Sequence, residues 1–273
     1  RLASECERLN SWGYSARLIS LEELSTLEPN LKIGQFHTGV YTRAEGHVLP
    51  VKVAEACMHK IQEAGGKAYL NTLVDSITQS GDKVFLRLDA EEMEFDQVVI
   101  AAGIDSTKLA KTAGINLPQR RSPGVVVKTK PLPSFIHSLA TIYLPPISKE
   151  EKEIHIRQDI DGAVMIGAGD QESETEDDSQ EYADKLIQRA ALYFDQLSGV
   201  ETIRVPVGLR PMPEDGLPVI GFSPGHNNIY LTLMHSGVTL APLVGALAAL
   251  EIVTGIPNGD LDPYRPDRFA SKS

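Results

Sequence analysis

The segment that most constrains the fold lies near the carboxyl end of the chain, at residues 228–255. The apolar run NIYLTLM, at 228–234, has the composition of a strand. HSGVTLAP then introduces a Ser-Gly kink, and LVGALAALEIVTG, at 243–255, predicts a long helix with Pro242 in its first turn. A strand that passes through glycine into a helix presents free backbone N–H groups at the positive end of the helix dipole. The segment therefore predicts a binding site for an electron-rich ligand.

An α/β layer is predicted around this junction. The run VVIAAG, at 98–103, shows no polar alternation, which predicts a strand buried on both faces. Further elements expected in this layer are an amphipathic helix at 51–64, β structure at 67–79 and 84–90, and a helix at 107–114 capped by Ser106.

A second layer has the texture of an antiparallel sheet. Its predicted strands are 125–130, 141–144, 154–160 and 163–169. Asp161-Gly162 predicts a two-residue hairpin between the last two strands. The layer also contains a solvated acidic stretch at 171–181, a helix at 182–197, and helices at 1–12 and 18–29, the last with Ser20 as N-cap and Glu23 at capping-box spacing.

These patterns predict a mixed α/β (α+β) fold with two interleaved lobes. The α/β lobe takes residues 45–119 and 204–273, and the antiparallel lobe takes residues 1–44 and 120–203. Two discontinuous lobes of this kind commonly bind a ligand at their interface.

Composition excludes several classes of function. The net charge of −11 argues against binding to nucleic acid or to an anionic membrane surface. Cys6 and Cys57 form no CxxC pair, so neither a disulfide framework nor a zinc site is indicated, and no other metal-binding pattern occurs. This cysteine usage is typical of a reducing compartment, so we expect a cytoplasmic protein. No apolar run is judged long enough to span a bilayer, so no transmembrane segment is expected.

Three side chains are candidates for chemistry. Arg210 lies between Pro206 and Pro211, which stiffen its backbone, so its guanidinium is suited to clamp a carboxylate. The alternative is a salt bridge between lobes. His235 lies two residues before the glycine of the junction, and His155 lies on the strand that leads into the hairpin. Neither histidine has a Ser or Cys beside it that would make a nucleophile triad.

The segments VGLRPMPEDGLPVIG and NIYLTLMHSGVTLAP, followed by a helix of small apolar residues, resemble the C-terminal end of the D-amino-acid oxidase family of flavoproteins. That family includes glycine oxidase, sarcosine oxidase, D-amino-acid dehydrogenases and opine oxidase subunits. Supporting similarities are GVYTRAEGHVLP, VVIAAG and IRQDIDGAVMIGAGDQE. The resemblance runs from about Trp12 to Phe269 and predicts a Rossmann-like FAD-binding lobe beside a substrate-binding lobe.

The resemblance implies FAD as the cofactor. Backbone N–H groups of Gly237, Val238 and Thr239 would face the N1/O2 edge of the flavin, where negative charge develops on reduction. The other residues that the resemblance assigns to the cofactor are Val74 beside the adenine, Ala101, Ala102 and Gly103 near the ribityl–pyrophosphate, and Gly208, Arg210, His235 and Ser236.

The resemblance also implies the substrate side of the site. Arg210 would anchor the carboxylate of a small amine substrate, and His235 would lie over the flavin rim. His155 falls where glycine-oxidase-like members have a tyrosine on the carboxylate side, so the second anchor differs from the family pattern.

The implied reaction oxidises the C–N bond of a small amino or imino acid. Hydride passes from Cα–H to flavin N5, and water hydrolyses the resulting imine. One alternative is an FAD-dependent 2-hydroxy-acid dehydrogenase with His235 as the base. Another is a non-catalytic fragment or subunit that binds no FAD by itself.

One departure from the family pattern affects the cofactor lobe. The G-x-G-x-x-G fingerprint that opens the family's chains is absent from this sequence. We therefore expect a truncated FAD-binding lobe in which the VVIAAG strand lacks a parallel neighbour. A homo-oligomer or a partner subunit is expected at that edge.

Overall fold

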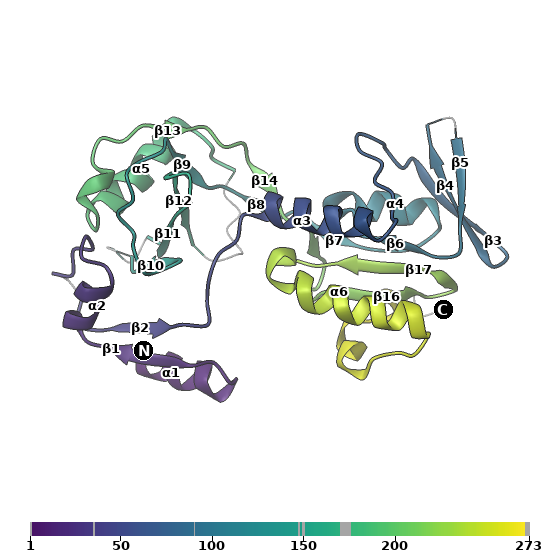
Figure 1. Cartoon of the computed structure of the whole chain (residues 1–273), viewed down its shortest axis with the longest axis horizontal. Coiled ribbons are helices and arrows are strands. Elements are labelled where there is room, and N and C mark those ends of the chain that lie inside the picture. The colour runs from purple at the N-terminus through teal and green to yellow at the C-terminus, as the bar shows by residue number, and fades with distance from the viewer. Residues whose placement is uncertain are drawn as a thin grey trace. The chain divides into compact units, whose positions relative to one another are not determined.

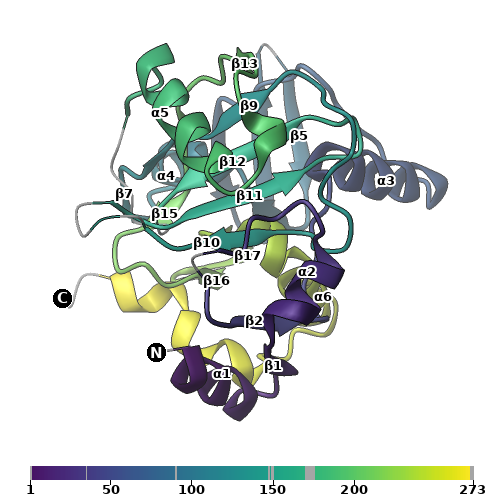
Figure 2. The ribbon, with the colours of Figure 1, turned by 90° about the vertical axis from the view of Figure 1, so that its left-hand side faces the viewer.

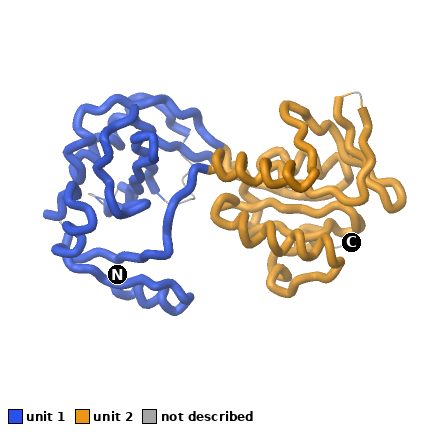
Figure 3. Tube along the Cα trace, viewed as in Figure 1, with its two compact units in different colours: residues 1–49, 123–208 blue, residues 50–122, 209–273 orange. Residues whose placement is uncertain are grey.

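The computed structural model describes residues 2–34, 36–89, 91–146, 148, 151–169 and 176–270 (Figure 1). The chain divides into two compact units, here called unit 1 (residues 1–49 and 123–208) and unit 2 (residues 50–122 and 209–273) (Figure 3). The predicted mixed α/β class is confirmed. The expected lobes had boundaries a few residues away from those of the units, and the roles assigned to the lobes stay predictions.

Unit 1 is built on a five-stranded antiparallel sheet in the order β10-β11-β12-β9-β13 (Figure 2). The strands are β9 (Val127–Thr129), β10 (Ile142–Leu144), β11 (Ile154–Gln158), β12 (Val164–Ala168) and β13 (Thr202–Ile203). One face is a continuous apolar surface because every second residue is a buried Ile, Leu or Val. This face packs against α5 (Gln180–Ala191) and η2 (Asp195–Leu197) to form the core of unit 1.

The N-terminal part of unit 1 comprises α1 (Leu2–Ser11), β1 (Ala16–Ile19), α2 (Leu21–Leu27) and β2 (Gly39–Thr42). The Oγ of Ser20 accepts a hydrogen bond from the N–H of Glu23 at 3.2 Å, which confirms Ser20 as the N-cap of α2. The carboxylate of Glu28, fully buried, accepts backbone N–H groups from residues 137–139. These bonds attach α2 to the loop that precedes β10.

The β11–β12 hairpin is present, but its turn is wider than the two residues predicted. The N–H of Asp159 donates to the carbonyl of Ala163 at 2.8 Å, which encloses three residues. Gly162 has a φ of +86°, the left-handed conformation that such a three-residue turn requires. Part of the predicted acidic stretch, residues 171–175, lies outside the described residues.

Unit 2 is built on a sheet in the order β16-β17-β6, with β16 (Val219–Ser223) antiparallel and β6 (Val98–Ile100) parallel to β17 (His226–Leu233). One face packs against α4 (Ser106–Thr112) and the hairpin layer of β3 (Ser76–Ser80), β4 (Lys83–Leu88) and β5 (Glu91–Phe95). The other face packs against α6 (Gly237–Thr254). The remaining elements are α3 (Pro50–Glu63), η1 (Gly103–Asp105), β7 (Gln119–Arg120), β8 (Pro123–Gly124), β14 (Gly208–Leu209), β15 (Met212–Pro213), η3 (Gly259–Tyr264) and η4 (Pro266–Phe269).

Three local predictions in unit 2 were wrong. The strand expected at 67–79 begins only at Ser76. Ser106 lies inside the first turn of α4, and the N-cap position belongs to Asp105. The VVIAAG strand ends at Ile100, and Val99 is 45% exposed instead of buried. Val99 is exposed because β6 has a paired strand on one side only in the described part of the chain. The homo-oligomer or partner subunit expected at this edge stays a prediction.

Helix α6 is longer than predicted. It begins at Gly237 instead of residue 243, so Pro242 lies inside it. Pro242 removes one intrahelical donor, which is tolerated near the start of a helix more readily than in its middle. With 18 residues, α6 is by length and composition able to cross a membrane, which corrects the expectation that the chain has no such segment. Its contacts with β16 and β17 are those of a core helix in an α/β layer.

A buried ionic cluster fixes α6 to the rest of unit 2. Glu251, 2% exposed, accepts hydrogen bonds from Tyr230 Oη at 2.6 Å and from Arg265 Nη1 at 2.9 Å. Burial alone raises the pKa of the Glu251 carboxyl, but donors from Arg265, Asn258 and Tyr230 outweigh burial and lower the pKa below its ordinary value. Burial and the adjacent carboxylate raise the pKa of Tyr230.

We predict that Glu251→Gln lowers the free energy of unfolding by about 3 kcal/mol at neutral pH, because it leaves Arg265 without its buried counter-charge. Since the folded-state pKa of Glu251 is lowered, its contribution is present above the unfolded value of about 4.3 and is lost as pH falls through the folded value. Urea unfolding at neutral and acidic pH measures both effects. Glu63→Gln, at a half-exposed site on α3, is the control. An equal loss for E251Q at both pH values would contradict the account.

Candidate functional site

The carboxyl ends of β6 and β17 meet at one edge of the unit 2 sheet. The two strands are parallel, with Ile100 opposite Leu231. The hydroxyl of Thr232 donates to the carbonyl of Ile100 at 3.2 Å, which ties the strand ends together. Residues 101–103 and 235–239 therefore leave the sheet at the same edge. In open parallel sheets, ligands bind outside this edge.

The first turn of α6 starts at this edge. The N–H of Leu240 donates to the carbonyl of Ser236 at 3.0 Å, as the first hydrogen bond of the helix. The N–H groups of Gly237, Val238 and Thr239 come before it and have no acceptor within the helix. All three residues are exposed. The group of N–H donors predicted from the sequence is therefore present.

The backbone at the junction is held in an uncommon conformation. Ser236 has φ 59° and ψ 31°, in the left-handed region that residues other than glycine seldom adopt. Such strain is found most often at binding and catalytic sites. At Gly237 a side chain would meet no heavy atom within 4 Å, so packing within the chain does not require glycine there. Open space beside this backbone is what close approach by a ligand needs.

His235 and Arg210 act on each other at the same edge. Burial, and then the positive charge of Arg210, lower the pKa of His235 below its ordinary value. His235 Nδ1 lies 2.8 Å from the Oγ of Ser236. The N–H of Arg210 donates to the carbonyl of Ser122 at 2.8 Å, which holds its backbone between the flanking prolines. The predicted guanidinium and the predicted histidine therefore belong to one site, where the histidine is neutral at neutral pH.

Other predicted residues are placed differently. Ala101 and Ala102 are exposed directly after β6, and Gly103 follows with a φ of +58°. Val74 precedes β3 and packs on the apolar core beneath that strand, so its role beside an adenine stays a prediction. Gly208 and His155 belong to unit 1.

His155 lies on the open face of the unit 1 sheet. Its ring centroid is 5.9 Å from that of Tyr143 on the neighbouring strand. On the opposite side it lies over Gly167, where any side chain would overlap the imidazole.

Two residues of these sites were missed in the sequence. Thr232 is the polar residue in an otherwise apolar strand, and that exception was the available signal. Arg157 shares the open face with His155 because the two residues are two apart on β11. The alternation in IHIRQ was the signal for this pairing.

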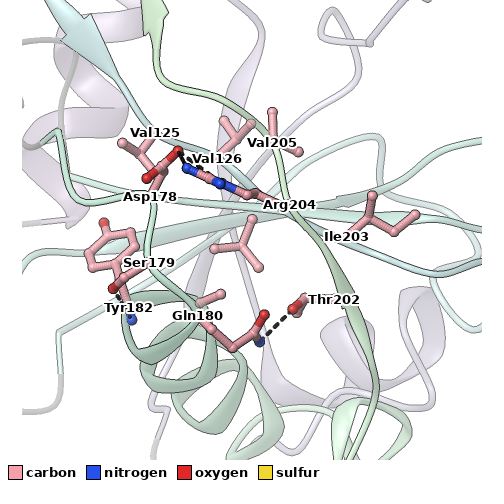
Figure 4. A pocket seen from close by; sticks show the side chains of 12 residues that line it. Val125, Val126, Asp178, Ser179, Gln180, Tyr182, Thr202, Ile203, Arg204 and Val205 are labelled. Atoms are coloured by element: carbon pink, nitrogen blue, oxygen red, sulfur yellow. Dashed lines mark hydrogen bonds and ion pairs between the residues drawn. The ribbon is translucent and has the colours of Figure 1, made fainter.

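A cavity of about 430 Å³ lies in unit 1 beside the start of α5 (Figure 4). Valines 125–127 and Val205 form much of its lining. Its charged groups are already paired, since Arg204 Nη2 contacts Asp178 at 3.0 Å, and Gln180 donates to Thr202 at 2.8 Å. None of the predicted site residues lines it. Within the described ranges, no group of three or more His, Cys, Asp or Glu could hold a metal ion.

Comparison with known proteins gives the family. The family model described as FAD dependent oxidoreductase (DAO) matches residues 1–250. The chain belongs to this family. Among curated relatives of this oxidoreductase, an opine oxidase subunit of Agrobacterium tumefaciens (strain Ach5) is 28% identical over 268 residues, covering 97% of the chain and 68% of the relative. Glycine oxidase of Pseudomonas aeruginosa is 28% identical over 257 residues, covering 91% and 67%.

Solved structures agree on the fold. The crystal structure of glycine oxidase from Geobacillus kaustophilus superposes with a TM-score of 0.79 at 23% identity, covering 98% of this oxidoreductase chain and 70% of that one. The predicted fold class, with a cofactor lobe and an antiparallel lobe, is therefore confirmed at the level of architecture.

The residues at the sheet edge of this oxidoreductase fit the flavin end of FAD. Three N–H groups without helical acceptors begin α6, and small exposed side chains follow β6. Neutral His235 leaves Arg210 as the positive group of the pair. Gly237 to Thr239 would hold the ring, and Ala101 to Gly103 would pass close to the cofactor chain.

We predict that Arg210→Met raises the pKa of His235 toward its ordinary value of about 6.5, because it removes the second cause of the lowering. Burial, the larger cause, remains, so the recovery is partial. NMR titration of the histidine ring protons measures it, with H235Q to assign the signal. Arg204→Met, which removes an exposed arginine of unit 1, is the control. An unchanged His235 titration in R210M would show that the two groups do not interact.

Proposed function

We propose that the protein oxidises the C–N bond of a small amino or imino acid, using FAD. The observation that carries the proposal is the electrostatic contact between Arg210 and His235 at the first turn of α6. It brings a carboxylate-binding group to the same edge as three free N–H donors. Such an edge suits a substrate acid beside an electron-rich ring.

When bound, FAD supplies the acceptor for the hydride that leaves the substrate Cα. The residues of the chain bind and orient the two reactants. N–H groups of Gly237, Val238 and Thr239 stabilise negative charge at the ring edge, and they need little reorganisation because the helix holds them. Arg210 binds the substrate carboxylate through a planar pair of donors. The substrate loses two electrons and two protons, and water then splits the imine into an oxo acid and an amine.

The names of the relatives support an amine substrate. One is described as a subunit of an opine oxidase, and another as glycine oxidase. A substrate amine that arrives neutral needs no side-chain base, and we assign none. Which amine is oxidised, and whether oxygen, a quinone or a protein takes the electrons, are not part of the proposal.

A second candidate, a 2-hydroxy-acid dehydrogenase, is favoured by one observation. The lowered pKa of His235 keeps its imidazole neutral, so it could accept a hydroxyl proton. Amines do not need that step, so His235 separates the two functions.

The test is anaerobic reduction of the flavin-loaded protein, followed by visible absorbance. We expect reduction by at least one of glycine, sarcosine, iminodiacetate and D-alanine, and none by D-lactate. Arg210→Met should raise the substrate concentration for half-maximal rate by about 100-fold, because a charge-assisted bidentate contact is lost. Arg204→Met should leave it unchanged. Reduction by D-lactate alone, abolished in H235Q, would establish the second candidate instead. A protein that purifies without FAD and does not take it up would contradict both.

A further inference from the structure

The open face of the unit 1 sheet carries two cross-strand rows of side chains. Tyr143, His155 and Gly167 are register partners in the first row. Arg157, Met165 and Lys128 are register partners in the second. The rows are about 7 Å apart, since neighbouring residues on one face of a strand are two residues apart. The opposite face is the apolar core, so these side chains project away from it.

Arg157 is the cation of the second row nearest to His155. Its Nη2 lies 3.1 Å from the Sδ of Met165, a weak acceptor. Its Nε lies 3.7 Å from the carboxylate of Asp159, beyond hydrogen-bond distance. This buried Nε has no acceptor among the described residues. The side chain is 33% exposed, so a ligand can reach it.

The carboxylates near Arg157 orient it without saturating it. Asp159, 7% exposed, lies between Arg157 and the Nε2 of His47, which is 4.0 Å away. His47 Nδ1 lies 2.8 Å from the carbonyl of Ala140. Asp161 lies 3.6 Å from Lys128, at the far end of the row. A guanidinium has five N–H donors, and these contacts occupy few of them.

The acidic groups on the other side of His155 are separate from this row. Glu45 and Glu153 act on Tyr143, where burial first, and then these charges, raise the pKa of the phenol. Positive charge is therefore concentrated at the Arg157 row, and negative charge at the Tyr143 end. A ligand with a carboxylate at the Arg157 row is favoured over one with an ammonium group there.

We propose that Arg157 binds a second carboxylate of the substrate, so that the preferred substrates are secondary amines whose nitrogen joins two carboxylate-bearing carbons. The inference rests on the proposed function, in which Arg210 takes the first carboxylate and His155 faces the substrate. Arg157 is then a specificity-determining residue. It separates iminodicarboxylic acids from simple N-methyl or primary amino acids, which have nothing to place against it.

The test uses two thioethers that cannot be oxidised at a C–N bond. Thiodiacetate has two carboxylates, and (methylthio)acetate has one with the same core. Calorimetry on the flavin-loaded protein should show thiodiacetate binding at least about tenfold more tightly, the usual scale for one charge-assisted contact. Arg157→Met should abolish this preference and change (methylthio)acetate binding less than about twofold. Arg157→Lys should retain part of it, because lysine keeps the charge without the planar fork.

Arg204→Met is the matched control, since it removes an arginine of the same unit that is paired with Asp178. It should leave both affinities unchanged. Thermal unfolding of each variant checks that it folds, and R157K carries the test if R157M does not. Equal binding of the two thioethers to the wild type, or an equal loss of both in R157M and R157K, would overturn the proposal.

Turnover separates this inference from the proposed function. If thiodiacetate depends on Arg157 but no amine reduces the flavin, the second carboxylate site stands and the oxidation does not. If sarcosine and iminodiacetate are oxidised with equal efficiency, and R157M affects them equally, the oxidation stands and the role of Arg157 is wrong.

Discussion

The parallel pairing of β6 with β17 is the constraint on which the candidate site depends. It brings two chain segments about 130 residues apart in sequence to one edge, as in the bond from Thr232 to Ile100. The start of α6 is then fixed at this edge by the left-handed Ser236. The cluster of Glu251, Arg265 and Tyr230 holds the other end of the helix, so its N–H donors are aimed by contacts at both ends.

The electrostatics at this edge follow from that placement. Three helix N–H groups and Arg210 all favour negative charge, and His235 remains neutral because burial and Arg210 oppose its protonation. The site therefore has positive potential from fixed donors rather than from several mobile charges. This arrangement suits an acidic substrate and a ring that becomes more negative on reduction, as expected in a family of FAD-dependent oxidoreductases.

Much of the site could be predicted from sequence, because its signals are local. The Ser-Gly kink, the proline-flanked Arg210 and the strand before residue 235 are contiguous patterns. Features that depend on tertiary neighbours could not be. VVIAAG looks buried on both faces, yet Val99 is exposed because a strand's burial depends on its sheet partners. Arg157 became a candidate only when the register placed it beside His155 and near a buried Asp159.

The most direct test of the central claim is the FAD affinity of Gly237→Ala compared with Gly245→Ala. Both glycines lie on α6, and at neither would a side chain meet a heavy atom within 4 Å of this chain. The account predicts that both variants keep wild-type stability or gain slightly from helix propensity. G237A should bind FAD about tenfold or more weakly, because its methyl group enters the space of the flavin. G245A should bind as the wild type does. Unchanged FAD affinity in G237A would contradict the assignment of the flavin to the first turn of α6.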